Sequence, residues 1–208
     1  MSKIDLNKLD SVQYDVLREI GNIGAGNATT ALASMLDVRI DMNVPKVQLV
    51  GFDEITTFIG HEEDIMAGIL LLLDGEINGM MMFILEIESA RGLVDTLMRR
   101  KPDIEKAGSP DFDEMECSAL NEIGNIITGA YLSALSDLTK LTISASVPSL
   151  QIDMACSILS VPAIEFGKIG DKVLLIETQF DTNCSMNGYF VLIPELDSYD
   201  KILSSLGI

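Results

Sequence analysis

The chain lacks tryptophan, has a single histidine, His61, and has three cysteines with no Cys-x-x-Cys spacing among them. With one histidine and no Cys-x-x-Cys spacing, a zinc site is not expected. A cysteine nucleophile needs a base beside it, and Cys117 has no histidine in its own half of the chain, so cysteine catalysis is not expected. Any chemistry therefore has to come from carboxylates, amides and hydroxyls.

Basic residues are also scarce, because 14 Lys and Arg stand against 32 Asp and Glu and the net charge is −18. Such a chain repels nucleic-acid phosphates and an anionic membrane surface, so neither is an expected partner. The longest apolar runs, such as 69–73, are far shorter than the ~20 residues of a membrane span, and no membrane insertion is expected. The acidity favours a partner with a basic rim, although it equally suits an ordinary solvated surface.

No leader-like segment is evident, so we expect reduced cysteines and a cytoplasmic protein. The 208 residues are 48% apolar with a mean hydropathy of +0.31, which excludes a disordered chain and suits one substantial core or two small fused ones. With few aromatic residues and 11 methionines, that core is expected to be aliphatic.

A polar pattern occurs twice, 103 positions apart. Its two copies are Asp15, Glu19, Asn22 and Pro45, and then Ser118, Glu122, Asn125 and Pro148. Both copies have the flanks Glu-Ile-Gly-Asn-Ile, and a later landmark at 78–84 recurs at 187–193, now 109 positions on. The chain is therefore predicted to be a single pseudo-two-fold domain over 1–208, made of repeats at about 1–104 and 105–208, because each half alone has only a small core.

Each half predicts the same order of elements, and the fold class is α/β of the α+β-like kind, with a mainly antiparallel sheet packed on long helices. A long amphipathic helix is followed by a short strand, further strands with a hairpin whose second arm follows Asn-Gly, and a closing helix. The expected ranges are 38–44, 69–73, 80–85 and 89–99, then 141–147, 173–178, 189–193 and 198–206. Residues 100–110 are the expected linker, and Ser109-Pro110-Asp111 is the expected start of the second long helix.

On a helical wheel, the polar pattern forms a narrow stripe beside the apolar face. Asp15, Glu19 and Asn22 lie within about 60° of one another, and so do Ser118, Glu122 and Asn125. The apolar face is expected to comprise Val12, Val16, Leu17, Ile20 and Ile23, and in the second copy Met115, Ala119, Leu120, Ile123 and Ile126. Each Glu and Asn is thus predicted to point into solvent about one turn apart.

Exposed Glu and Asn residues decorate most amphipathic helices, so a single copy of the pattern means little. Asn and Gly disfavour a helix interior, Gly by about 1 kcal/mol relative to Ala, yet both helices keep Ile-Gly-Asn-Ile. We interpret the small Gly21 and Gly124 as leaving the surface open to a close partner. Pro45 and Pro148 follow β-prone runs and are expected to be structural.

The glycines at 21–26 resemble a phosphate-binding loop, but such a loop follows a strand and opens a helix. Here they lie inside a helical pattern, and only Gly124 and Gly129 recur in the second copy. Nucleotide binding is therefore not expected, and Gly24 and Gly26 are predicted to allow close helix packing or a kink.

The twice-present pattern, Asp or Ser-x3-Glu-x2-Asn-x22-Pro with its shared flanks, resembles the CheC/CheX/FliY family of bacterial chemotaxis phosphatases over essentially the whole chain. Two intact copies resemble the CheC type. One copy per chain is typical of the CheX type, and an additional C-terminal flagellar-switch domain, missing here, is typical of the FliY type. The resemblance implies a pseudo-two-fold CheC-like fold.

The resemblance also implies hydrolysis of the aspartyl phosphate of the response regulator CheY. Glu19 and Glu122 would each pair with a lysine of the receiver, and Asn22 and Asn125 would orient the attacking water. Asp15 and Ser118 would be supporting contacts. The chain would need no cofactor of its own, because the Mg²⁺ belongs to CheY. An amide can orient a water as donor and acceptor.

A second partner implied by the resemblance is the receptor deamidase CheD. One alternative is therefore a chemotaxis adaptation regulator that acts mainly by binding CheD, with weak phosphatase activity. Another is a flagellar-switch component that recruits the receiver. The sequence neither ranks the two polar sites nor indicates a CheD-binding surface.

Overall fold

The computed structural model describes residues 6, 8–42, 46–51, 54–103, 105–166, 172–181 and 185–208. Its elements follow one order twice: helix, two strands, helix, two strands, helix. The first set is α1 (Ser11–Leu36), β1 (Asp41–Met42), β2 (Lys46–Gly51), α2 (Ile55–Ile59), β3 (Ile65–Gly75), β4 (Gly79–Glu86) and α3 (Ile87–Leu97). The second is α4 (Glu114–Thr139), β5 (Ile143–Ala145), β6 (Ser149–Met154), α5 (Ala155–Phe166), β7 (Lys172–Asp181), β8 (Ser185–Pro194) and α6 (Leu196–Ser205).

The two long helices are defined at both ends by local chemistry. Each has 26 residues and begins with a capping box, formed by Asp10 with Gln13 in α1 and by Asp113 with Glu116 in α4. Both end on a residue in the left-handed region, with φ of 55° and 61°. The long helices predicted from the repeat are confirmed.

The predicted start of α4 at Ser109-Pro110-Asp111 is wrong. The Asp113 carboxylate accepts a hydrogen bond from the Glu116 N–H at 2.8 Å, so the helix begins at Glu114. The backbone carbonyl oxygens of Ser109 and Asp111 instead accept hydrogen bonds from the guanidinium of Arg91. The stretch between α3 and α4 is the predicted linker.

All strand pairs in the described sheet are antiparallel, in the order β1-β7-β8-β4-β3-β5, with β2 also on β7 and β6 also on β3. The predicted hairpins β3–β4 and β7–β8 are confirmed, as is the fold class. The first two strands of each half pair with the hairpin of the other half: β1 and β2 pair with β7, and β5 and β6 pair with β3. The shared sheet supports the prediction that residues 1–208 form one domain made of two repeats, about 1–104 and 105–208. The domain assignment itself stays a prediction.

The pseudo-two-fold relation is visible in the register of the two central strands. Met82 of β4 lies opposite Val191 of β8, its own counterpart 109 positions on. Around this pair, Gly79 faces Pro194 as Leu85 faces Gly188. The second Asn-Gly pair therefore lies within β8, and not before it as predicted. Gly79 has φ +147°, and a Cβ there would lie 2.2 Å from the Ile193 carbonyl oxygen, so this glycine serves a close strand approach.

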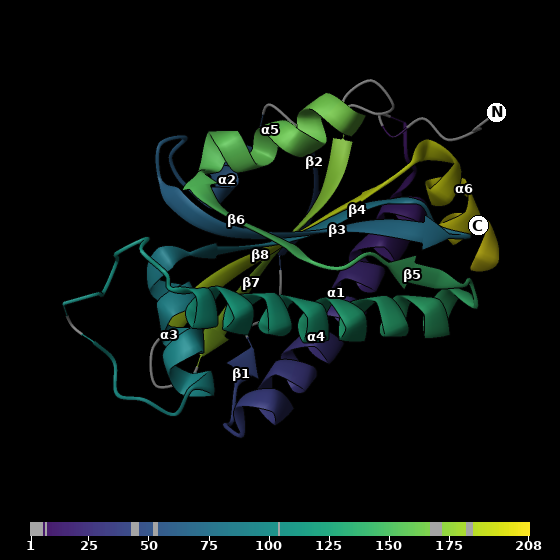
Figure 1. The fold of residues 1–208 in the computed structure, drawn as a ribbon. Helices are drawn as coiled ribbons and strands as arrows, with labels where there is room; N and C mark the ends of the chain where they lie inside the picture. Colours follow the sequence, from purple (N-terminus) through teal and green to yellow (C-terminus); the bar gives the residue numbers. More distant parts are fainter. Residues whose placement is uncertain are drawn as a thin grey trace.

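Helices cover both faces of the sheet (Figure 1). The long α1 and α4 lie side by side below it, over a core that includes Leu17, Leu120 and Phe190. On the opposite face, α2 and α5 cover a second core that includes Ile55 and Ile158. Neither α2 nor α5 was predicted.

The crossing of the long helices depends on one glycine. A Cβ at Gly24 of α1 would lie 2.3 Å from the Tyr131 ring of α4, and that ring is fully buried against Phe190. Gly24 therefore allows close helix packing, as the sequence predicts. No helix in the described part of the chain is long and apolar enough to span a membrane.

Candidate functional site

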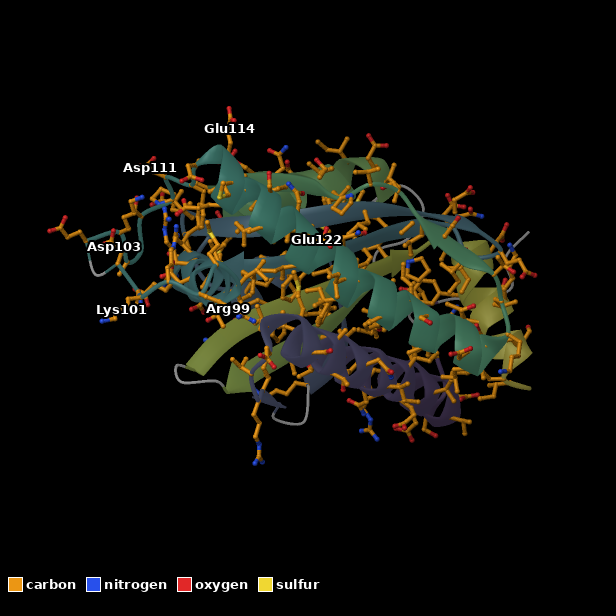
Figure 2. The ribbon with its side chains drawn as sticks, turned by 60° about the horizontal axis from the view of Figure 1, so that its bottom comes forward. Arg99, Lys101, Asp103, Asp111, Glu114 and Glu122 are labelled. Atoms are coloured by element: carbon orange, nitrogen blue, oxygen red, sulfur yellow. The ribbon has the colours of Figure 1, made fainter. Side chains whose placement is uncertain are left out.

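The second polar stripe lies on the outer face of α4. Ser118, Glu122 and Asn125 are all exposed, and Figure 2 shows Glu122 on the face turned away from the sheet. The Ser118 hydroxyl donates to the Glu114 carbonyl at 2.8 Å. Among the described residues, the Glu122 and Asn125 side chains make no hydrogen bond or ion pair, so a carboxylate and an amide stand free one turn apart. The sequence prediction is confirmed for this copy.

The first stripe on α1 differs at its most important position. Asp15 and Glu19 are exposed, and Asp15 pairs with Arg18 at 3.2 Å. Asn22 is half-buried, and its Oδ1 is buried without a hydrogen-bond partner among the described residues. The prediction that Asn22 points freely into solvent is therefore wrong. A wheel describes one helix alone, whereas in the fold α1 also packs against α4, β2 and β7.

Two apolar side chains beside the stripes are exposed, although the wheel places them on the apolar face. Val12 is 56% exposed and Met115 is 66% exposed. They are matched positions, each the second residue of its helix. The first turn of each long helix thus presents an apolar side chain next to the polar stripe, which suits a surface that contacts a protein.

The glycines next to the asparagines face inward, contrary to the interpretation that they open the surface to a partner. A Cβ at Gly21 would lie 2.8 Å from Val47 Cγ2, and one at Gly124 would lie 2.5 Å from Ile69 Cγ2. Both glycines are buried, so they let the helices lie directly on the sheet.

The glycines one turn beyond the asparagines are the open ones. A Cβ at Gly26 or Gly129 would meet no atom within 4 Å. Both lie about 20° from the first stripe residue on the wheel, in line with the stripe. Close packing therefore does not account for Gly26. Sequence reasoning noted the repeat of this glycine but did not place it on the stripe.

Of the two prolines of the pattern, Pro148 lies within the described residues. Pro148 is half-buried and immediately precedes β6, a strand that pairs with β3. This is the strand terminus that the sequence predicts. Pro45 lies outside the described residues.

A buried ion cluster, which the sequence did not indicate, fixes the start of α4. Glu116 is 0% exposed and accepts hydrogen bonds from Arg91, at 3.1 Å, and from Arg100. Arg100 also pairs with Asp95 at 2.5 Å. Burial alone would raise the pKa of Glu116, but hydrogen bonds from Arg100, the Asp113 N–H and Arg91 outweigh it and lower the pKa to about 2. The matching residue of α1 is the neutral Gln13.

The chemistry available on α4 is that of a surface and not of an enclosed active site. The charged residues of α4 are Glu114, Glu116, Glu122 and Asp137, and none is basic. Within the described ranges, no group of three or more His, Cys, Asp or Glu residues is arranged to hold a metal. Glu122 can attract a cation and Asn125 can orient a water, but the group to be attacked has to come from a partner.

Comparison with known proteins matches both copies of the pattern. A model of the CheC-like family matches residues 12–49 and 115–152, which are again 103 positions apart. The CheY-P phosphatase CheC of Bacillus subtilis (strain 168) is 37% identical over 211 residues, covering 97% of each chain.

Two solved structures share the fold. Thermotoga maritima FliY has a TM-score of 0.75 at 22% identity, covering 96% of this chain and 98% of that one. A CheX–CheY–BeF3–Mg²⁺ complex from Borrelia burgdorferi contains a chain with a TM-score of 0.53 at 17% identity, covering 90% of this chain and 100% of that one. With its two copies of the polar pattern and its near full-length similarity to a CheC, the chain belongs to the CheC-like family.

Proposed function

We propose that the chain is a chemotaxis phosphatase that hydrolyses the aspartyl phosphate of the response regulator CheY. The observation that carries the proposal is the free carboxylate and amide of Glu122 and Asn125, exposed one turn apart on α4. An exposed helix face of this kind suits insertion into the active site of another protein. The similarity to a CheY-P phosphatase supports this substrate.

In the proposed mechanism, the Glu122 carboxylate pairs with a lysine of the receiver and holds α4 against it. The Asn125 amide then accepts and donates hydrogen bonds to one water and aims it at phosphorus, in line with the bond to the aspartate. The water attacks, the P–O bond to the aspartate breaks, and inorganic phosphate leaves. The Mg²⁺ belongs to CheY. A hundredfold acceleration requires about 2.7 kcal/mol, which is within reach of one positioned water.

We propose that both copies act, with Glu19 and Asn22 as the weaker one. Asn125 is exposed, whereas the Oδ1 of Asn22 is buried and has to turn outward before it reaches a substrate. Asp15 and Ser118 remain supporting contacts in this proposal.

The test follows phosphate loss from phosphorylated CheY of the same organism, with wild type, Asn22→Ala, Asn125→Ala and the double variant. We expect the largest loss from Asn125→Ala among the single variants, and no acceleration by the double variant. A double variant as active as wild type would overturn the assignment of the sites.

The same experiment, repeated with CheD added, tests the alternative that the chain acts mainly by binding CheD. A chain that acts mainly by binding CheD, with weak phosphatase activity, would accelerate phosphate loss only slightly, with or without CheD. No described residue is assigned to CheD. A cytoplasmic location is part of the proposal, because the substrate belongs to a cytoplasmic signalling system.

A further inference from the structure

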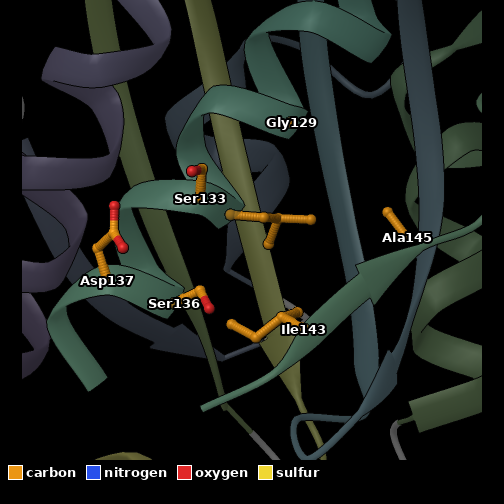
Figure 3. Close-up of a pocket in the computed structure, with 7 residues that line it drawn as sticks. Gly129, Ser133, Ser136, Asp137, Ile143 and Ala145 are labelled. Carbon is orange, nitrogen blue, oxygen red and sulfur yellow. The ribbon is translucent and has the colours of Figure 1, made fainter. Parts of the chain in front are cut away.

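A pocket of about 330 Å³ lies where the α4 stripe meets strand β5 (Figure 3). Its walls come from the second half of α4 and from the short β5 at the end of the sheet. The lining residues are Gly129, Leu132, Ser133, Ser136, Asp137, Ile143 and Ala145.

The pocket directly continues the proposed catalytic stripe. At about 1.5 Å rise per residue, Gly129 lies about 6 Å beyond Asn125 along the helix, and Asp137 about 18 Å beyond it. A stable protein partner covers about 800 Å² on each side, a patch with a radius of roughly 16 Å. A partner centred on Asn125 therefore also covers the near part of the pocket, at Gly129, Leu132 and Ser133, and a long basic side chain at its rim reaches toward Asp137.

The chemistry of the pocket indicates what it receives. Leu132, Ile143 and Ala145 make an apolar floor, and the exposed Asp137 carboxylate pairs with no cation among the described residues. The Ser136 hydroxyl is already used, because it donates to the Leu141 carbonyl at 2.5 Å and ties the helix end to the approach to β5. The other charges on α4 are acidic too, so the complementary surface is basic.

The first repeat does not carry the same set of residues. At the matched positions, Thr29 replaces Leu132, Ser34 replaces Asp137 and Met42 replaces Ala145. Ile40 matches Ile143, but the leucine of the floor, the carboxylate and the small strand residue are changed. The pocket thus belongs to the α4 site and distinguishes it from the α1 site.

We infer that this pocket is a docking subsite for the receiver that presents its phosphoryl group to Asn125. It takes an apolar side chain of the receiver, and a lysine or arginine beside that side chain pairs with Asp137. The inference rests on the proposed function, and it assigns to the pocket the task of holding the substrate and not of reacting with it.

The test uses the full chain with Glu19→Ala and Asn22→Ala, so that both binding and activity come from α4 alone. Ala145→Met introduces the residue of the first repeat, and Gly129→Leu fills the pocket from the helix. The matched control is Gly26→Leu, which adds the same side chain in open space on the inactivated stripe. Thermal unfolding checks that each variant folds. Gly129→Leu is expected to melt no lower than its parent, because its Cβ meets no atom within 4 Å.

Two quantities are measured: the Kd for CheY carrying Mg²⁺ and beryllium fluoride, which stands in for the phosphoryl group, and kcat and KM with phosphorylated CheY. We expect both pocket variants to raise Kd and KM about tenfold or more while kcat stays within about twofold. Asp137→Asn is expected to weaken the salt dependence of KM. Gly26→Leu should change none of these.

Unchanged Kd and KM in both pocket variants, with an active parent, would overturn the docking subsite and leave the proposed function intact. A change in self-association measured by sedimentation, with unchanged KM, would also overturn it and assign the pocket to a second copy of the chain. A parent without activity or binding would overturn the proposed function, and the subsite with it.

Discussion

Replacing Glu116 by glutamine tests how strongly the buried ion cluster stabilises the start of α4. Glutamine keeps the shape of the side chain and is able to complete the cap. In α1 the Asp10 N–H donates to Gln13 Oε1 at 3.1 Å, just as the Asp113 N–H donates to Glu116 Oε2 at 3.0 Å. The variant therefore removes one buried charge without removing the capping box.

The magnitude follows from two separate considerations. The pKa of Glu116 is about 2 instead of 4.5, and at about 1.4 kcal/mol per pKa unit this corresponds to about 3 kcal/mol. Removing one partner from a buried ion pair costs about 3–5 kcal/mol, because the other charge stays buried, and Arg91 is only 6% exposed. We expect Glu116→Gln to lower the free energy of unfolding by about 3 kcal/mol at pH 7.

The effect also has a defined pH dependence. Because the pKa is lower in the folded than in the unfolded chain, the stabilisation is complete above about pH 4.5 and disappears as the pH falls toward 2. Wild type and variant therefore converge in acid, with less than half of the difference left at about pH 3. Urea unfolding followed by circular dichroism measures it. A difference below about 1 kcal/mol at pH 7, or one equally large at pH 3, would show that the charge of Glu116 does not stabilise the fold in this way.

Three further predictions follow from burial and packing. Asn22→Ala is expected to raise the free energy of unfolding by about 1–3 kcal/mol, because it removes a buried carbonyl without a hydrogen-bond partner. Asn125 is exposed, so Asn125→Ala should raise the free energy of unfolding by less than about 1 kcal/mol. Equal effects of the two variants in urea unfolding would count against the difference in burial. Gly124→Ala should lower the free energy of unfolding by about 1–3 kcal/mol, because the added methyl group overpacks Ile69. Gly26→Ala should leave the free energy of unfolding unchanged or raise it by up to about 1 kcal/mol. The reverse order of melting temperatures would contradict this. The second half, 105–208, expressed alone, is expected to show no cooperative unfolding transition, because its strands β5 and β6 pair with β3; a cooperative transition would show that the halves are independent.

The sequence predicts those parts of the fold that depend on residues close together in the chain. The long helices follow from periodic apolar residues, and the hairpins follow from β-prone runs around turns. The short α2 was missed because five residues carry too little periodicity. The helix α5 was missed because it is apolar almost throughout and contains Pro162, so no polar face marks it.

What the sequence could not provide depends on contacts between distant residues. The exchange of strands between halves, such as β2 on β7, has no local signal. The burial of Asn22 Oδ1 and the cluster of Arg91, Arg100 and Glu116 arise only when separate elements meet. The exposed Glu122 and Asn125 were predictable, because the surface side of one helix decides their position.

Whether Asn125 acts on the water or on docking is decided by measuring turnover and binding in the same variant. In the chain carrying Asn22→Ala, the further change Asn125→Ala is compared for turnover of phosphorylated CheY and for Kd of CheY with Mg²⁺ and beryllium fluoride. We expect turnover to fall about a hundredfold, or about 2.7 kcal/mol, while Kd changes by less than about threefold. Turnover retained, or a Kd weakened in parallel with the loss of turnover, would contradict it.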